Sequence, residues 1–272
     1  MIIGSALAAR AGSFHALAAS CALLAAIFIQ IGTNYYNDYA DFARGVDTPD
    51  RVGPLRATQA GLVAPMQMKA AAAIAFALAV VCGAYLIYRG GWVIAVIGFA
   101  SIGAGYLYSA TRFALAYVGL ADLFVLVFFG PVAVGGTYYV QTLSMTPSVL
   151  IAGLAPGLLA TAILLVNNIR DIDQDRAADK YTLVVRFGRR FGVRLYAACF
   201  VFASLVPVVL FLRNNGSAAS LSAVLVLPLG LPLVRSLTAT RDGEKLNETL
   251  AATARLLLLY SVVFAVGWNL GS

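Results

Sequence analysis

The amino-acid sequence predicts an all-α, multi-pass transmembrane helix bundle, and three observations support this fold class. Hydrophobic residues make up 61% of the 272-residue chain and charged residues only 11%, whereas an ordinary soluble domain has roughly 25% charged residues. The mean hydropathy is +0.86. The apolar residues also gather in runs of about 20, the length that crosses the hydrocarbon core of a bilayer.

Eight apolar runs are separated by charged or Gly- and Pro-rich breaks, and each is expected to form one membrane-spanning helix. They cover residues 17–36, 70–88, 92–108, 116–140, 148–168, 193–212, 217–234 and 251–270. Residues 1–9 are also apolar but too few to cross, and they lack the basic start and cleavage site of a signal peptide. We therefore expect eight full spans plus a partial first helix. They form a single integral-membrane domain, residues 1–272, whose first helix is incomplete.

The charged residues of the connections fall mainly on one side of the predicted bundle. Because consecutive spans alternate in direction, the connections form two sets, and one set carries 16 of the 19 basic residues. The positive-inside rule makes that side cytoplasmic. All 12 acidic residues lie on or near the same side, although acids contribute little to orientation. We therefore expect a multi-pass protein of the cell (inner or plasma) membrane whose active site is on the cytoplasmic side.

Composition also limits the partners that the chain could bind. The net charge of +7 suits attraction to the anionic headgroups of a lipid bilayer, or a basic rim that gathers an anionic substrate. No basic domain or reading motif supports binding to nucleic acid. Cys21, Cys82, Cys199 and His15 lie in or near apolar runs without the spacing of metal ligands, so we expect them to be packing or interface residues.

Asparagine and aspartate side chains gather at the end of the first long span. Asn34, Asp38 and Asp41 stand at i, i+4 and i+7, which places them on one face of a helix. Asn37 lies beside Asp38, and Asp47 follows in the loop. A single aspartate at a helix end is commonly a capping or solvated residue.

The same arrangement occurs again four spans later. Asn167 or Asn168, then Asp171 and Asp175, follow helical spacing, and Asp179 comes one turn later. Both clusters stand at the C-terminal ends of helices, where the helix dipole disfavours negative charge. The repetition is much more specific than either cluster alone.

Carboxylates gathered in this way repel one another unless cations neutralise them. Oxygen ligands suit hard cations, and Mg²⁺ typically takes one or two carboxylates, several waters and substrate phosphates. Two such clusters facing each other would hold a diphosphate through Mg²⁺. The expected metal ligands are Asp38, Asp41, Asp47, Asp171, Asp175 and Asp179.

Both motifs resemble those of the UbiA superfamily of intramembrane aromatic prenyltransferases. The segment Asn37-Asp38-Tyr39-Ala40-Asp41 is similar to the family's Asn-Asp-x-x-Asp helix, and Asp171 to Asp175 is similar to its Asp-x-x-x-Asp helix. The resemblance extends over nearly the whole chain and is closest to the menaquinone branch, the 1,4-dihydroxy-2-naphthoate polyprenyltransferases. It implies a nine-helix architecture. The chain departs from the family at its start and at residues 109–117, where a turn containing Gly and Pro is expected.

The resemblance also implies a reaction and a set of site residues. A polyprenyl diphosphate would donate its prenyl group to 1,4-dihydroxy-2-naphthoate, with Mg²⁺ as cofactor and with loss of CO₂ and diphosphate, giving demethylmenaquinone for menaquinone biosynthesis. The expected catalytic residues are Asp38, Asp41, Asp171, Asp175 and Asp122. The expected substrate-binding residues are Asn34, Asn37, Arg56, Tyr106, Asn167, Asn168, Lys180 and Arg186.

Several of these roles have a second interpretation. Asp122 lies inside an apolar stretch, where it would either orient or deprotonate the acceptor or hydrogen-bond a neighbouring helix. Arg56, Lys180 and Arg186 flank the aspartates, yet positive-inside placement also explains them. Tyrosines near the cytoplasmic ends could stabilise an allylic cation or form an aromatic belt. Small residues would line a tunnel for the prenyl tail or serve close helix packing. They are Gly98, Ser101, Gly103 and Gly105.

Two alternative functions stay open. A UbiA-type enzyme could act on another aromatic acceptor such as 4-hydroxybenzoate, or on haem or chlorophyllide. A membrane transporter is the alternative from a different class, but it would be expected to place acids near the membrane midplane within inverted repeats. Here the acids lie at one face, and the two aspartate motifs repeat in the same orientation.

Overall fold

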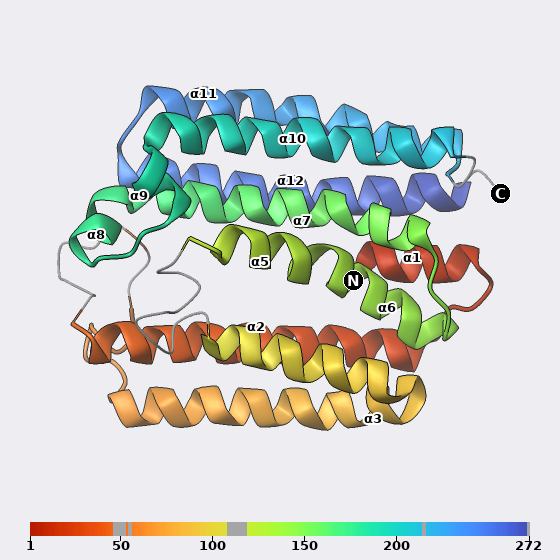
Figure 1. Cartoon of the computed structure of the whole chain (residues 1–272), viewed down its shortest axis with the longest axis horizontal. Coiled ribbons are helices and arrows are strands. Elements are labelled where there is room, and N and C mark those ends of the chain that lie inside the picture. The colour runs from red at the N-terminus through yellow and green to blue at the C-terminus, as the bar shows by residue number, and fades with distance from the viewer. Residues whose placement is uncertain (46–52, 54–55, 108–118, 214–215, 271–272) are drawn as a thin grey trace.

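The computed structural model describes residues 1–45, 53, 56–107, 119–213 and 216–270, and within these ranges the chain is helical with no strand. The long helices run side by side along one axis (Figure 1). The predicted all-α helix bundle is therefore confirmed.

The helices have the following bounds. In chain order they are α1 Ile2–Arg10, α2 Ala16–Ala43, α3 Pro65–Leu107, α5 Ala121–Val127, the π-helical η1 Phe128–Val132, α6 Ala133–Thr142, α7 Pro147–Arg170, α8 Ile172–Ala177, α9 Leu183–Phe187, α10 Arg189–Leu212, the 3₁₀-helical η2 Ala218–Gly230, α11 Leu231–Ala239 and α12 Gly243–Leu270. Within the described ranges, seven helical stretches are long and apolar enough to cross a membrane, if α5 to α6 and η2 to α11 each count as one.

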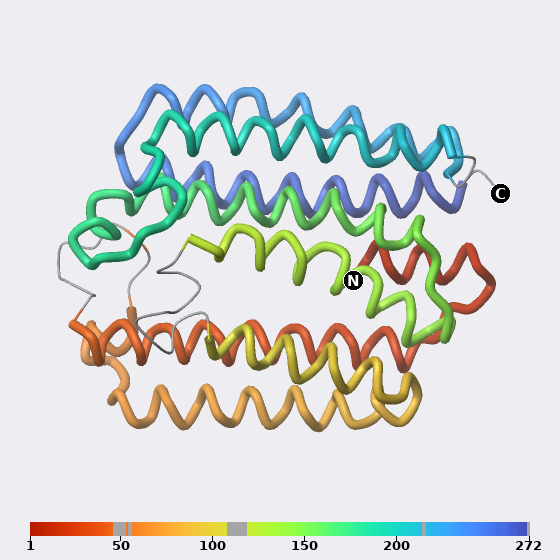
Figure 2. Tube along the Cα trace, viewed as in Figure 1, coloured from red at the N-terminus to blue at the C-terminus, as the bar shows by residue number. Residues whose placement is uncertain are grey.

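Helix α3 contains two of the predicted spans. Its 43 residues would measure about 65 Å if straight, roughly twice the hydrocarbon thickness. Gly91 adopts φ 67° and ψ −156°, a conformation that glycine adopts far more readily than other residues, and the chain turns back on itself there (Figure 2). The break predicted between residues 88 and 92 is thus confirmed. The number of membrane crossings stays a prediction.

Several helices differ from the apolar runs that predicted them. Helix α2 continues to Ala43, α7 continues to Arg170, and α12 begins at Gly243, because helical hydrogen bonding does not require an apolar side chain. The predicted run 217–234 begins as a 3₁₀-helix over η2, an unusually long one for this geometry. In the predicted run 116–140, Gly130 and Pro131 lie in η1, where proline removes a backbone donor.

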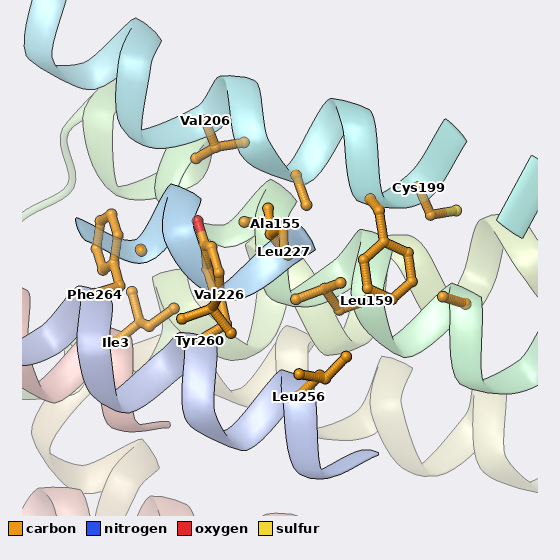
Figure 3. Close-up of a cluster of buried hydrophobic side chains, with 14 of the residues drawn as sticks. Ile3, Ala155, Leu159, Cys199, Val206, Val226, Leu227, Leu256, Tyr260 and Phe264 are labelled. Carbon is orange, nitrogen blue, oxygen red and sulfur yellow. The ribbon is translucent and has the colours of Figure 1, made fainter. Parts of the chain in front are cut away.

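The main hydrophobic core surrounds α7. Side chains of α1, α7, α10, η2 and α12 meet there, among them Ile3, Leu159, Tyr260 and Phe264 (Figure 3). On another side of α7, Gly153 faces η1 so closely that a Cβ would lie 2.7 Å from Pro131 Cα. Small residues permit such close approach of membrane helices.

The long connections lie at one end of the bundle. The C-terminal end of α2, the start of α3 and the segments that join α7 to α10 and α11 to α12 all occur at the left in Figure 1, where α8 and α9 also lie. At the opposite end, residues 11–15 and 143–146 make short turns. The ends of α2 and α7, which carry the two aspartate clusters, therefore lie at the same end of the bundle.

Candidate active site

Asp41 connects the two acidic segments. It lies in the last turn of α2, and its side chain is only 3% exposed. Its Oδ2 atom is 3.4 Å from Arg56 Nη2 and 3.7 Å from Lys180 Nζ. Because Lys180 follows α8, this pair of contacts brings the second acidic segment to the end of α2. The two cations also offset the unfavourable placement of a carboxylate at a helix C-terminus.

Asp38 holds the chain that follows α2. Its carboxylate accepts hydrogen bonds from the backbone N–H groups of Ala57 and Thr58, at 3.1 and 3.4 Å. Asp38 itself is buried. This arrangement fixes the turn that carries Arg56, so Asp38 helps to place a cation beside Asp41.

Arg170 orients Asp171 at the end of α7. Its Nε and Nη2 atoms donate to the two carboxylate oxygens of Asp171 at 2.7 and 2.6 Å, a bidentate pairing. The same guanidinium donates to Asn167 Oδ1 at 2.7 Å and to Asn247 Oδ1, from α12, at 2.6 Å. The Arg170 side chain is 1% exposed. Arg170 and Asn247 were not predicted as site residues, since positive-inside placement alone accounts for an arginine at this end of a span.

Asp175 experiences the charges of both clusters. The pKa of Asp175 is raised to about 7, chiefly by burial; the charge of Lys180 lowers it, the nearby carboxylates of Asp171 and Asp41 raise it, and Arg170 lowers it. Three carboxylates from the two clusters thus lie near enough to interact.

The donor atoms suit Mg²⁺ bound together with a diphosphate. Among the described residues, no group of three or more His, Cys, Asp or Glu side chains is arranged to hold a metal alone. Mg²⁺, however, is usually bound through one or two carboxylates plus substrate phosphates. The carboxylates of Asp41, Asp171 and Asp175 carry oxygens of this kind, and Lys180 and Arg56 pair with Asp41.

Two predicted site residues lie at exposed positions, and a third is not among the described residues. Asp179 is exposed with φ 54°, and its Oδ1 accepts a hydrogen bond from the Tyr181 hydroxyl at 3.3 Å. Arg186 is exposed and donates through Nε to the carbonyl oxygen of Tyr181 at 2.9 Å. Asp47 lies outside the described residues. The predicted roles of these three residues stay predictions.

An apolar chamber of about 830 Å³ extends from the acidic end into the bundle. Asn34, Asn37 and Asn167 line its mouth, and α2 lines it from Asn37 down to Ala22, a length of about 22 Å. The other walls come from α3, from α5 to α6, from the second half of α7, and from α12. The three asparagines therefore lie where the anionic end and the apolar tail of a bound amphipathic molecule would meet.

Tyrosine rings gather at the acidic end of α2. The ring of Tyr36 lies 4.7 Å from that of Tyr106 and 5.9 Å from that of Tyr39, between centroids. Lys69 Nζ lies 5.5 Å from the Tyr39 ring centroid. Tyr36 was not singled out from the sequence, because its neighbour Tyr106 comes from the distant end of α3.

Asp122 and Asn168 are buried but do not line the chamber. Among the described residues, neither carboxylate oxygen of Asp122 has a hydrogen-bond partner, and the same holds for Asn168 Nδ2. The backbone oxygen of Asp122 accepts from the Thr161 hydroxyl of α7 at 3.4 Å. Among the described residues, no hydrogen bond joins the Asp122 carboxylate to another side chain, and its predicted catalytic role stays a prediction.

Arg170→Lys should destabilise the protein, because lysine keeps the charge but loses the planar fork that joins Asp171, Asn167 and Asn247. We expect the free energy of unfolding to fall by at least about 1.5 kcal/mol, seen as a lower melting temperature in detergent. Arg176→Lys is the matched control, since the Arg176 side chain is 59% exposed and pairs with the exposed Asp173 at 3.5 Å. Equal melting temperatures for the two variants would contradict the role of Arg170.

A helix bundle with carboxylates and cations above an apolar chamber defines an intramembrane enzyme for a substrate with an anionic head and an apolar tail. The sequence pattern of the UbiA prenyltransferase family matches residues 1–266. The chain belongs to this family and is a prenyltransferase.

Curated relatives and a solved structure agree with the family. The 1,4-dihydroxy-2-naphthoate octaprenyltransferase of Escherichia coli (strain K12) is 38% identical over 276 residues, covering 98% of this chain and 89% of that protein. The protein of the same name from Mycobacterium tuberculosis (strain ATCC 25618 / H37Rv) is 37% identical, covering 90% of this chain and 82% of that protein. A UbiA homolog from Archaeoglobus fulgidus, solved with DMAPP and Mg²⁺, shares the fold. Its TM-score is 0.65 at 17% identity, covering 98% of this chain and 94% of that one.

Proposed function

We propose that this chain transfers a polyprenyl group from a polyprenyl diphosphate to 1,4-dihydroxy-2-naphthoate, with Mg²⁺ as cofactor, giving the reduced (quinol) form of demethylmenaquinone, CO₂ and diphosphate. The observation that carries the proposal is the contact of Asp41 with both Arg56 and Lys180, because it joins the two acidic segments above the apolar chamber. The names of the relatives at 38% and 37% identity support the naphthoate acceptor. We also propose that this end faces the cytoplasm, as the distribution of basic residues favours.

Residues of the chain would bind the donor by its two chemically different ends. Lys180 and Arg56 donate hydrogen bonds to the diphosphate oxygens, and Asp41, Asp171 and Asp175 supply the oxygen ligands for Mg²⁺. When bound, Mg²⁺ neutralises the charge that develops on the leaving diphosphate. The apolar chamber takes the prenyl tail and keeps water from the reacting carbon. The faces of Tyr36, Tyr39 and Tyr106 stabilise positive charge on the allylic group.

The reaction breaks the allylic C–O bond, and the diphosphate leaves with the bonding electrons. The ring carbon that bears the carboxylate then bonds to the allylic carbon, and CO₂ leaves, returning its bonding electrons to the ring. No ring hydrogen is lost at that carbon. The naphthoate reaction therefore needs no base there. Transfer to 4-hydroxybenzoate, the alternative acceptor, would replace a ring hydrogen and would need a base.

The proposed function is tested by incubating membranes that contain the protein with Mg²⁺ and a polyprenyl diphosphate. Parallel reactions contain labelled 1,4-dihydroxy-2-naphthoate or labelled 4-hydroxybenzoate. We expect a lipid-extractable prenylated product from the naphthoate only. If only 4-hydroxybenzoate gave a product, that compound would be the acceptor and the naphthoate proposal would be wrong. If neither acceptor gave a product, the proposed function would be refuted.

Mg²⁺ should bind more weakly at lower pH. A proton on Asp175, whose pKa is about 7 without metal, competes with Mg²⁺, because the metal binds the ionised carboxylate. We expect the Mg²⁺ concentration that half-saturates donor binding to be about tenfold higher at pH 6 than at pH 8. Asp175→Asn should remove most of this difference. The same pH dependence in Asp175→Asn and in the unmodified chain would assign the effect to another group.

A further inference from the structure

Four glycines line the apolar chamber, and they are of two kinds. At Gly105 of α3, an added Cβ would collide with the hydroxyl oxygen of Thr33, so Gly105 serves the close packing of α3 against α2. At Gly83, Gly98 and Gly136, an added Cβ would meet no atom within 4 Å. The space beside these three residues therefore belongs to the chamber. Gly103 also has open space beside it but does not line the chamber.

The three open glycines lie at a similar depth on different walls. Gly83 and Gly98 each stand seven residues from the turn at Gly90 and Gly91, on the two arms of α3, which is about 10 Å along the helix. Gly136 stands six residues before the end of α6, about 9 Å along its axis. Beyond them the chamber is lined by Leu86, Ile94 and Val140, which are buried in a common cluster that closes this end.

The distance from the acidic end to the three glycines can be followed along two helices. Asp41 lies eight residues, about 12 Å, from Thr33 on α2. Thr33 faces Gly105, which lies seven residues, about 10 Å, from Gly98 on α3. A diphosphate beside Asp41 is thus about 22 Å from the glycines. A tail of three isoprene units, with twelve in-line carbons, cannot exceed about 18 Å, because a C–C bond measures about 1.5 Å. A tail of eight units is longer than this distance.

We propose that Gly83, Gly98 and Gly136 set the length of prenyl tail that the enzyme accepts, by leaving the inner end of the chamber open to the tail of the diphosphate donor. An added Cβ at any of these positions would meet no atom within 4 Å, so a larger side chain there would extend into the chamber and block the tail rather than displace a helix. Short donors end before this depth and are unaffected. The proposal rests on the proposed function, because it takes a prenyl tail as the occupant.

The test compares Gly98→Phe with Gly103→Phe, a matched substitution on the same helix that does not face the chamber. Each is assayed with a three-isoprene and an eight-isoprene diphosphate, with Mg²⁺ and the naphthoate. For Gly98→Phe we expect kcat/KM to fall at least about tenfold for the long donor and to change by no more than about twofold for the short one. Gly103→Phe should leave both donors within about twofold.

Retained activity with the short donor shows that the Gly98→Phe variant is folded. Gly136→Leu, from the opposite wall, should also discriminate against the long donor. Three results would overturn the proposal. They are equal losses of kcat/KM for both donors in both chamber variants, no loss for either donor, and the same dependence on donor length in Gly103→Phe. When the two donors compete for binding without acceptor, Gly98→Phe and Gly136→Leu should likewise favour the short donor over the long one, compared with the unmodified chain. A chain that binds both donors with this preference but transfers neither would refute the proposed function and leave the tail-length proposal intact.

Discussion

Asp41→Asn is expected to lower kcat by about 100- to 1,000-fold, a loss of the size seen when one preorganised group that stabilises transition-state charge is removed. Asp41 is the carboxylate that both Arg56 and Lys180 contact, and it also raises the pKa of Asp175. Asparagine has nearly the same shape but no charge to share with these cations or with a metal. Initial rates at saturating donor, acceptor and Mg²⁺ measure the effect.

Asp173→Asn is the matched control for Asp41→Asn. The Asp173 side chain belongs to the second acidic segment but is 84% exposed, and it pairs with Arg176 at 3.5 Å. We expect its kcat to stay within about twofold of the unmodified chain, as for most surface substitutions. If Asp41→Asn kept more than half of the activity, the two acidic segments would not form the catalytic site.

Lys180→Met is expected to lower kcat/KM for the donor by about 10- to 100-fold, since a hydrogen bond between charged groups typically contributes about 1.5–3 kcal/mol. Lys180 lies where it can bind a diphosphate oxygen, and its aliphatic stem is kept by methionine. Lys245→Met, at an exposed position near the start of α12, is the control and should leave kcat/KM unchanged.

The double variant Asp41→Asn/Lys180→Met adds a second measurement. The two side chains are 3.7 Å apart, so their effects on kcat/KM for the donor should not be independent. The loss of kcat/KM in the double variant should be smaller than the product of the losses of kcat/KM in the two single variants. Fully additive losses would mean that the two residues act in separate places.

The sequence predicted the site as far as helical periodicity and charge could do so. Asn34, Asp38 and Asp41 share a helix face because the helical period requires it, and the structure adds that α2 remains helical to Ala43. The second cluster was predicted in the same way, but the structure divides it, because α7 ends at Arg170 and the short helix α8, which carries Asp175, begins at Ile172. That the two clusters lie near each other was inferred from their repetition, and the contact between Asp41 and Lys180 now gives this inference a geometry.

Other features depended on contacts that no local pattern contains. Asn247 meets Arg170 only because α12 packs beside α7, and Tyr36 meets Tyr106 only because α3 turns back at Gly91. The distinction between Gly98 and Gly105 also required the structure, since both are small residues in one apolar run. By contrast, the irregular helix η1 could have been predicted from the sequence, because Gly130 and Pro131 together disfavour a regular α-helix. The prediction of one span over residues 116–140 did not use this pair.

We propose that the two acidic segments together hold a Mg²⁺ diphosphate. The most direct measurement is calorimetric titration of the full chain in detergent with a prenyl thiolodiphosphate, a donor analogue that resists ionisation, with and without Mg²⁺. We expect binding that requires Mg²⁺ and that is lost in Asp41→Asn and in Asp171→Asn, but kept in Asp173→Asn. Binding that is independent of Mg²⁺, or that survives the loss of either acidic segment, would contradict the claim.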